Sequence, residues 1–452
     1  MIINDFKLLV KLLKPLKVYN LYHFKPIEGF NIDSRQLKVK EGFIAILGKY
    51  HDGHEFILKA VAGGARAIIA QKYIPTKPKV PYFVVNDTQE SLGRIAEYIR
   101  IKKKPLVYGI TGSLGKTTTK EMLSFLLEPH LKVLKNKRTE NNFLGVGKTI
   151  LSLRDEKVMI LELGTNAKGE IETLAHISKP DIGVITFIKP VHLEGLKSMR
   201  GIYEEKISLF KAKSGMKAVL NRDDPYLRKV HLKQKTYWFG QSEDNNVFAK
   251  LIVRNETDSI FLVQNKYRLM LPSNREFFIT NALAAILSAH LLGISLKRLV
   301  ERMNEFKDFP SMRMELQRLK GFLVLNDAYN ANPYSFSKVL ETVGNYDSKK
   351  IAVVGDMLEL GKKSRYYHEQ IAYKLAKGGF DYCFTIGEQT FYLNKKLRQL
   401  GHKRAFHFDK TKAIADFINK KFKDKVELKK RYLIFLKASR KMKLEEILGY
   451  LK

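Results

Sequence analysis

Apolar runs of five to eight residues alternate with longer segments in which apolar and polar positions mix at helical spacing. Such runs, bounded by glycine or polar residues, predict buried strands. The predicted strands are 41–47, 65–71, 106–110, 158–163, 182–188, 217–221, 322–328, 350–356, 382–387 and 432–439. Alternation of apolar strands with helices predicts an α/β fold with mostly parallel, doubly wound sheets.

Helical segments are predicted between these strands. An amphipathic helix at the N-terminus is expected to end near Pro15, and residues 53–64 predict a helix closed by Gly63 and Gly64. A further helix follows the glycine-rich stretch after 110, with Met122, Leu123, Leu126 and Leu127 on one face. Residues 277–294 predict a long apolar helix.

The length of 452 residues suggests about three domains. A helix that ends in a basic stretch before Pro105 indicates a first boundary, and a new α/β pattern begins near residue 310. We therefore predict domains at 1–102, 103–309 and 310–452.

Composition narrows the class of protein. Hydrophobic content of 45% and charged content of 28% are typical of a globular protein. A single cysteine, Cys383, excludes an internal disulfide framework and favours a reducing compartment, so we expect a cytoplasmic protein. No run reaches the roughly 18 apolar residues needed to span a bilayer.

The net charge of +35 suggests an anionic partner, which could be nucleic acid, an anionic membrane or a phosphorylated small molecule. The lysines are spread along the chain, and no RNA-binding aromatic motif or zinc-finger spacing accompanies them. A lysine-rich surface is also typical of a heat-adapted protein. Charge alone therefore does not identify the partner.

The stretch "GITGSLGKTTTKEM" (109–122) predicts a phosphate-binding loop. Backbone N–H groups at a glycine-rich turn, together with a helix N-terminus, cradle phosphate oxygens. Lys116 would reach the β- and γ-phosphates, and the Thr117 hydroxyl would bind Mg²⁺. The strict spacing of this motif is not met, because position 110 is Ile. The less favoured alternative is a glycine-rich turn without a ligand.

Two polar residues follow other strands expected in the same sheet. Glu162 ends the run 158–163, where a carboxylate could hold Mg²⁺, although strand ends also favour solvated acids. His192 follows the run 182–188 and could bind a divalent ion, although a lone histidine is more often packed or exposed. His51 and His54 flank Asp-Gly in a turn without an evident third ligand, so we do not predict a metal site there.

Several strings, taken in order, resemble the Mur ligases over nearly the whole chain. They are "IDSRQLKVKEGFIAILGKYHDGHEF" (32–56), "TGSLGKTTTKE", "TENNFLGVGKT" (139–149), "ELGTNAKGEI" (162–171), "PVHLEG" (190–195), "LNRDDP" (220–225), "NALAAI" (281–286), "NDAYNANPYS" (326–335), "GDMLELG" (355–361) and "KASRKMKLEE" (437–446).

The resemblance implies three α/β domains: an N-terminal domain that binds UDP, a central ATP-binding P-loop domain and a C-terminal Rossmann-like ligase domain. "YNANP", "GDMLELG" and "KASR" look most like the members that add D-alanyl-D-alanine to a UDP-N-acetylmuramoyl tripeptide in peptidoglycan synthesis. ATP would phosphorylate the terminal carboxylate of the tripeptide, and the dipeptide amine would attack the acyl phosphate. Phosphate is a better leaving group than a carboxylate oxygen, so the enzyme's work is positioning and charge neutralisation.

The resemblance also implies roles for individual residues. Lys206 matches the lysine that the family carbamylates, which would make it an oxygen ligand beside a second Mg²⁺; without the resemblance it would be taken for a surface lysine. Arg313 would reach from the third domain toward the γ-phosphate, and Asp327 would contact the ribose or the hinge. The nucleotide and its metal would be held by Thr111, Gly112, Ser113, Leu114, Gly115, Lys116, Thr117, Thr118, Glu162, His192 and, at the adenine, Asn281. Ser34 and Arg35 would bind UDP, Asn141 and Asn142 would face the substrate, and Asn330 and Asn332 would lie where the amine substrate is recognised.

The chain departs from common family residues at Gly147, at Ala167 and Lys168, at Lys189 and at Ala438, none of which removes a group with an assigned role. We expect ATP and Mg²⁺ as cofactors, no nucleic acid, no membrane span and a monomer. A sibling ligase that adds another amino acid is the nearest alternative. A nucleic-acid-stimulated P-loop ATPase and a non-catalytic nucleotide-binding scaffold are more distant ones.

Overall fold

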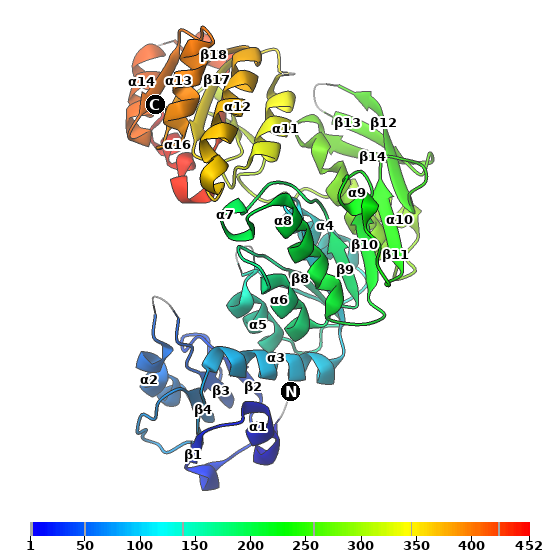
Figure 1. Cartoon of the computed structure of the whole chain (residues 1–452), viewed down its shortest axis with the longest axis vertical. Helices are drawn as coiled ribbons and strands as arrows, with labels where there is room; N and C mark the ends of the chain where they lie inside the picture. Colours follow the sequence, from blue (N-terminus) through cyan, green and yellow to red (C-terminus); the bar gives the residue numbers. More distant parts are fainter. Residues whose placement is uncertain (1–2, 49–50, 138–139, 256–257, 345, 424) are drawn as a thin grey trace.

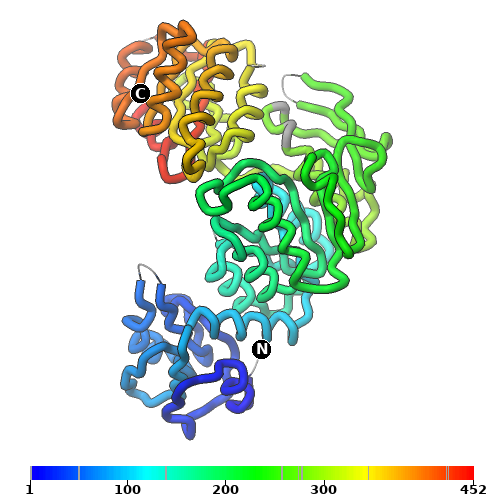
Figure 2. Tube along the Cα trace, in the orientation of Figure 1, coloured from blue at the N-terminus to red at the C-terminus, as the bar shows by residue number. Residues whose placement is uncertain are grey.

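Three α/β units follow one another along a crescent in the computed structural model (Figure 1). Residues 3–48, 51–137, 140–255, 258–344, 346–423 and 425–452 are described. Positions 49–50 and 139, which belong to two of the quoted strings, lie outside these residues. The N-terminal and C-terminal units occupy the two ends of the crescent, with the central unit between them (Figure 2). The predicted three-domain α/β fold is confirmed, whereas the residue boundaries between the domains stay a prediction.

The N-terminal unit is built on a five-stranded sheet of order β1-β5-β4-β3-β2, parallel except for the β1–β5 pair. The strands are β1 Lys17–Tyr19, β2 Gly29–Asn31, β3 Glu41–Ile44, β4 Ala67–Ala70 and β5 Tyr82–Val84, and the helices are α1 Phe6–Leu13, α2 Ile57–Ala62 and α3 Thr88–Lys103.

Helix α3 lies between the first two units, where Figure 1 shows it running along the base of the central unit. Its buried side chains Leu92, Ile95 and Ile99 belong to one apolar cluster that includes residues of both units. Arg100 adds polar contacts, because its guanidinium donates to the carbonyls of Ser178 and Lys179 at 2.9 Å. The two units are therefore joined by a continuous core.

The central unit has a nine-stranded sheet of order β14-β13-β12-β11-β10-β9-β6-β8-β7, parallel from β12 to β7 and antiparallel over β12–β14. Its strands are β6 Leu106–Thr111, β7 Val133–Lys135, β8 Val158–Glu162, β9 Ile182–Ile185, β10 Lys217–Asn221, β11 Thr236–Gly240, β12 Val247–Arg254, β13 Asp258–Val263 and β14 Tyr267–Pro272. Its helices are α4 Lys116–Leu127, α5 Phe143–Leu151, α6 Glu170–Ser178, α7 Leu193–Leu196, α8 Met199–Ile207, α9 Ile279–His290 and α10 Leu296–Met303.

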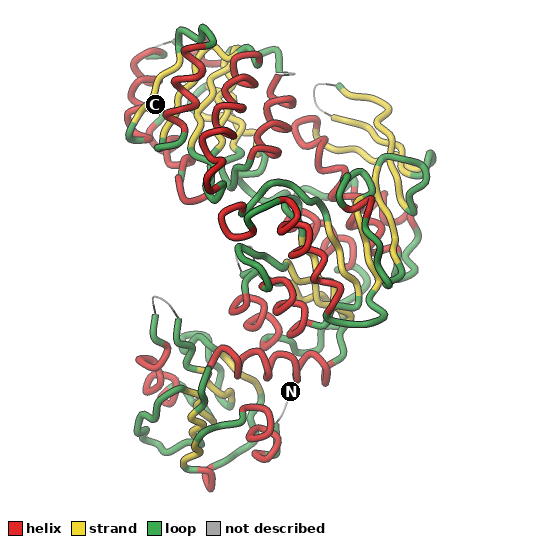
Figure 3. The backbone as a smooth tube through the Cα atoms, viewed as in Figure 1, coloured by secondary structure: helices red, strands yellow, loops and turns green. Residues whose placement is uncertain are grey.

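The third unit has helices on both faces of a six-stranded sheet (Figure 3). The strand order is β15-β16-β20-β17-β18-β19, with only β15 antiparallel to its neighbour. The strands are β15 Glu315–Leu319, β16 Phe322–Asn326, β17 Lys349–Gly355, β18 Phe380–Ile386, β19 Ala405–Phe408 and β20 Tyr432–Lys437. The helices are α11 Pro333–Gly344, α12 Ser364–Lys377, α13 Thr390–Gln399, α14 Thr411–Lys421, α15 Val426–Lys430 and α16 Ile447–Tyr450.

All ten predicted strands are present, but several elements end earlier than expected. The strand predicted at 182–188 ends at Ile185, because Thr186 and Phe187 leave the sheet to hydrogen-bond the glycine-rich loop. The helix predicted at 53–64 is divided into a 3-10 turn and α2, and the one predicted at 277–294 is limited to α9. Gly293, with φ of 87°, lies in the turn that follows α9.

In the described part of the chain, no helix has the length and apolar character needed to cross a membrane.

Candidate active site

The glycine-rich loop lies between β6 and α4, at the carboxyl edge of the parallel strands. Gly112 and Gly115 have φ of 143° and 80°, values that side-chain-bearing residues rarely adopt. A Cβ on Gly112 would lie 2.1 Å from Thr186 Oγ1, and one on Gly115 would lie 2.1 Å from Asn281 Nδ2. Glycine is thus required at both positions by conformation and by space.

The loop is held from behind by the segment that follows β9. The Ser113 hydroxyl donates to the carbonyl of Lys189 and accepts from its N–H, both at 2.9 Å. The Thr186 hydroxyl donates to the carbonyl of Leu114. Thr111, the last residue of β6, is buried. These contacts fix the loop backbone before any ligand binds.

Lys116 begins α4 and folds back over the loop, where its ammonium donates to the carbonyl of Gly112 at 2.8 Å. Desolvation lowers the pKa of Lys116 and Arg313 adds to this effect, while Glu162 opposes it. The ammonium therefore lies where a phosphate could replace the carbonyl as its partner.

Two further groups around α4 have features of a ligand site. The buried hydroxyl of Thr118 has no hydrogen-bond partner among the described residues, and buried polar groups are usually paired. Asn281, at the start of α9, donates to the carbonyl of Gly115 at 2.9 Å and to Thr119 Oγ1 at 3.0 Å. Asn281 thus supports the loop itself, beside the space where the adenine was expected.

Glu162 is a buried carboxylate at the end of β8, next to the glycine-rich loop. Its Oε2 accepts from the Thr117 hydroxyl at 2.8 Å, and its Oε1 accepts from Asn141 Nδ2 at 2.9 Å. Carboxylate and hydroxyl oxygens next to bound phosphate are the donors that Mg²⁺ prefers. Thr117 and Glu162 therefore fit a magnesium site, although no group of three or more His, Cys, Asp or Glu side chains that could hold a metal occurs among the described residues.

Lys206, near the end of α8, is fully buried. Burial lowers its pKa well below the ordinary value, nearby Lys116 lowers it further, and the carboxylates of Glu205, Glu170 and Glu162 only partly offset this. Lys206 is therefore no surface lysine, and the depressed pKa favours the neutral amine.

His192 contacts the third unit rather than Glu162. It has φ of 52° just before α7, and its Nδ1 lies 2.5 Å from Glu359 Oε2. This contact lowers the pKa of Glu359. A backbone hydrogen bond connects the same two segments, since the N–H of Glu194 donates to the carbonyl of Glu359 at 3.2 Å. Here His192 joins two domains, and its expected place in the metal site stays a prediction.

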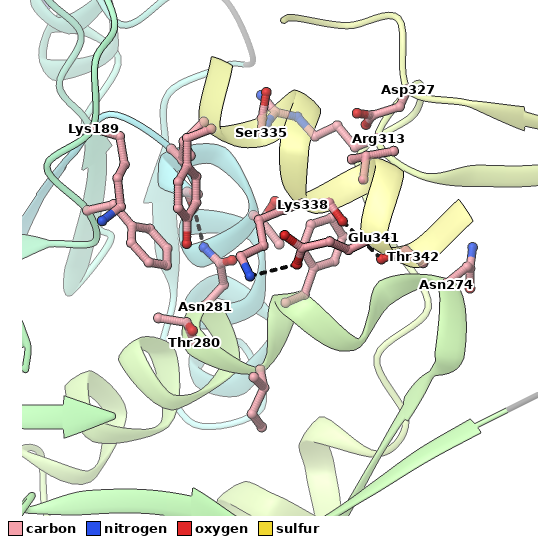
Figure 4. Close-up of a pocket in the computed structure, with 18 of the residues that line it drawn as sticks. Lys189, Asn274, Thr280, Asn281, Arg313, Asp327, Ser335, Lys338, Glu341 and Thr342 are labelled. Atoms are coloured by element: carbon pink, nitrogen blue, oxygen red, sulfur yellow. Dashed lines mark hydrogen bonds and ion pairs between the residues drawn. The ribbon is translucent and has the colours of Figure 1, made fainter. Parts of the chain in front are cut away.

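Arg313 crosses from the third unit to α4. Its guanidinium lies 4.4 Å from the centre of the Tyr329 ring, and Nη2 lies 3.4 Å from Thr117 Oγ1. Its buried Nε has no hydrogen-bond partner among the described residues. Figure 4 shows Arg313 beside Asp327 and Ser335. An arginine so placed can donate to a phosphate bound at the loop.

Asp327 uses both carboxylate oxygens within the third unit. Oδ1 accepts from the N–H of Met314 at 3.0 Å, and Oδ2 pairs with the buried ammonium of Lys437. Lys437 also donates to the carbonyl of Asn330 at 3.1 Å. Asp327 therefore holds the backbone next to Arg313, and its expected contact with the ribose or the hinge stays a prediction.

The side chains of the two asparagines in "YNANP" accept hydrogen bonds from nearby backbone N–H groups. Asn330 accepts from the N–H of Ala331 at 2.9 Å. Asn332 caps α11, where its Oδ1 accepts from the N–H of Ser335 at 2.9 Å. Both asparagines line the cavity described next, so recognition of the amine substrate by their remaining groups stays a prediction.

A cavity of about 1230 Å³ lies between the central and third units and is lined by residues of both. Its lining includes the loop, Glu162, Asn281, Arg313 and the start of α11. Figure 4 shows Asn281 and Thr280 on the central side facing Lys338 and Glu341 on the third-unit side. The volume lies somewhat above the range of ordinary small-molecule pockets, which suits a nucleotide with a second ligand.

The remaining expected residues lie toward the N-terminal unit, outside this cavity. Ser34 and Arg35 belong to a turn, in which the exposed Arg35 makes two hydrogen bonds of 2.9 Å with Asp33. Asn142 caps α5 by accepting from the N–H of Gly145 at 2.9 Å. UDP binding at Ser34 and Arg35 stays a prediction.

The chain matches three family descriptions in order: "Mur ligase family, catalytic domain" over 26–100, "Mur ligase middle domain" over 110–289 and "Mur ligase, glutamate ligase domain" over 312–434. The UDP-N-acetylmuramoyl-tripeptide–D-alanyl-D-alanine ligase of Buchnera aphidicola subsp. Baizongia pistaciae is 33% identical, over 96% of this chain and 94% of the relative. The chain belongs to the Mur ligase family. It is accordingly an ATP-dependent ligase.

Other relatives agree with this. The Bacillus subtilis (strain 168) protein of the same name is 30% identical over 99% of this chain and 98% of its own. A crystal structure of MurF from Acinetobacter baumannii superposes with a TM-score of 0.85 at 26% identity, covering 99% of this chain and 98% of that one. MurF from Thermotoga maritima in complex with ADP gives 0.81 at 28% identity, covering 95% and 97%. A nucleic-acid-stimulated ATPase is not favoured.

Sequence reasoning missed several members of the site. Glu359 lies in the quoted string "GDMLELG", but nothing in the sequence pairs it with His192. Lys437 lies in the quoted string "KASRKMKLEE", but nothing in the sequence indicates that it is a fully buried lysine. Lys120 and Asn136, which surround Glu162, were not singled out either. The sequence pattern gives little indication of either residue. A lysine in a helix is usually exposed to solvent, so the burial of Lys120 could not be expected from the sequence.

Proposed function

We propose that this chain ligates D-alanyl-D-alanine to a UDP-N-acetylmuramoyl tripeptide, using ATP and an acyl phosphate intermediate. The shared name of the relatives supports this substrate pair. One contact carries the proposal. Arg313 of the third unit contacts the hydroxyl of Thr117, which also donates to Glu162, so the third unit reaches the phosphate loop.

In this proposal the loop N–H groups and Lys116 hold the ATP phosphates, and Arg313 contacts the phosphoryl group in transfer. Thr117 and Glu162 would hold Mg²⁺, which neutralises phosphate charge when bound. Lys206, with its depressed pKa, is suited to carbamylation, because only the neutral amine reacts with CO₂. The carbamate would then add an oxygen donor to the site.

We further propose that the third unit holds the dipeptide near Asn330 and Asn332 while the N-terminal unit holds the UDP group at Ser34 and Arg35. The attacking amine must approach the acyl phosphate within about 3–3.5 Å. Domain boundaries near 102 and 309, a cytoplasmic location and a monomeric state complete the proposal.

Phosphate release measured with purified UDP-N-acetylmuramoyl tripeptide tests the proposal. We expect release with D-alanyl-D-alanine and little with single amino acids; the reverse order would favour a sibling ligase. Release driven by DNA or RNA without the tripeptide would refute the ligase assignment. Lys116→Ala should abolish turnover, and near-normal release from that variant would exclude the role of the loop.

A further inference from the structure

Lys120 is a lysine with no surface exposure, one turn along α4 from Lys116. Its ammonium donates to the carbonyl of Asn136 at 2.5 Å, lies 3.2 Å from Glu121 Oε1 and lies 4.0 Å from Glu162 Oε2. A buried ammonium contributes little net stability, since desolvation offsets most of the attraction. An apolar residue would fill the same space at lower cost, so the charge itself requires an explanation.

Asn136 connects this ammonium to the backbone of Glu162. Its Oδ1 accepts from the Glu162 N–H at 2.8 Å, and its Nδ2 donates to the Glu162 carbonyl at 2.9 Å. The same Nδ2 donates to the carbonyl of Glu140 at 2.8 Å. Lys120 therefore fixes, through Asn136, the peptide groups on both sides of the carboxylate that faces the phosphate loop.

The side chain of Glu162 is constrained in the same network. Oε1 accepts from Asn141, which belongs to the same connection as Asn136, and Oε2 accepts from Thr117 on α4. The ammonium of Lys120 lies on the Oε2 side as a fixed positive charge. The Thr117 hydroxyl contacts the same Oε2 at 2.8 Å, so the positive charge of Lys120 attracts the oxygen that faces the phosphate loop and helps to hold it in that orientation.

We propose that Lys120 is a positioning residue: its buried charge orients Glu162 and the connection carrying Asn141, so that the carboxylate faces nucleotide-bound Mg²⁺ beside the phosphate loop. This inference rests on the proposed function for its nucleotide and metal. It adds a residue that touches neither substrate nor metal.

The test measures binding of N-methylanthraniloyl-ADP to the full chain, with and without Mg²⁺, together with thermal unfolding. Lys120→Met keeps the length of the side chain and removes its charge, and Lys120→Arg keeps the charge. Lys135→Met is the matched control, because the Lys135 ammonium pairs with Glu121 Oε2 at 2.7 Å and, within the described part of the chain, forms no ion pair or hydrogen bond with Glu162 or Asn136. No peptide substrate is needed, so a wrong choice of acceptor would not affect the result.

We expect Lys120→Met to bind the nucleotide in EDTA as the unmodified protein does, but to require at least about tenfold more Mg²⁺ for the tighter complex. In turnover kcat should fall more than KM rises, and Lys120→Arg should recover much of the loss. Unchanged Mg²⁺ dependence in folded Lys120→Met, or an equal loss in Lys135→Met, would overturn the inference. If Lys120→Met does not fold, Lys120→Gln can still donate to the Asn136 carbonyl, and a normal Mg²⁺ response in that variant would also overturn it.

Discussion

Replacing Asp327 with alanine should selectively destabilise the third unit. The carboxylate is the charged partner of Lys437, whose side chain is only 1% exposed. Without it the ammonium keeps only the carbonyl of Asn330 as a hydrogen-bond acceptor among the described residues, and the N–H of Met314 loses its partner. Removing one member of a buried ion pair costs about 3–5 kcal/mol, a large part of the ~5–15 kcal/mol that stabilises a domain.

Two probes separate this effect from global unfolding. The chain has one tryptophan, and Trp238 lies in β11 of the central unit, so its fluorescence reports on that unit. Circular dichroism reports on all three units. In guanidinium titrations of Asp327→Ala, the dichroism transition of the third unit should move by about 3–5 kcal/mol, while the Trp238 transition stays in place.

Asp416→Ala is the matched control, because Asp416 is an exposed acid on α14 of the same unit. An exposed substitution of this kind is expected to change stability by no more than about 0.5 kcal/mol. The reasoning fails if Asp327→Ala shifts the third-unit transition by less than about 1 kcal/mol, or if Asp416→Ala shifts it equally.

Three further predictions concern the nucleotide site. Gly115→Ala should weaken ADP binding at least about tenfold by calorimetry, because its Cβ would meet Asn281 at 2.1 Å; Gly401→Ala, also at positive φ but with no atom within 4 Å, should leave binding unchanged. Arg313→Lys should lower kcat about 10- to 100-fold with ATP affinity nearly kept, since lysine lacks the guanidinium fork; a normal kcat would contradict this. Enzyme depleted of CO₂ should lose activity and regain it when bicarbonate is added. The recovery should be faster as the pH rises through the lowered pKa of Lys206, because the neutral fraction of the amine grows. Lys206→Ala should show no such recovery.

The strands were predictable because parallel strands covered on both faces form continuous apolar runs. The runs that became β8 and β20 are buried at every position. In the antiparallel extension, β12 was not predictable in this way, since it is buried at its first three positions and exposed at the rest. Such a strand lacks both the continuous run and a regular alternation.

The residues of the candidate site also fall into two groups, those that a local sequence pattern indicates and those that it does not. The sequence predicts that Lys116, Thr117 and Glu162 lie near one another, because each follows a recognisable strand or motif, and Thr117 and Glu162 are hydrogen-bonded in the structure. The partner of His192 was not predictable, since Glu359 is 167 residues away and approaches only when the third unit docks. Contacts between domains depend on rigid-body placement, which local residue patterns do not encode.

The continuous core through α3 has an evolutionary consequence. A fragment ending at residue 102 would leave Leu92, Ile95 and Ile99 without the α5 and α6 side chains with which they share a cluster. The third unit instead forms two apolar clusters almost entirely from its own residues. Recombination between relatives could therefore exchange the third unit as a module, whereas the first two must be inherited together, with substitutions on α3 matched by substitutions on α5 and α6.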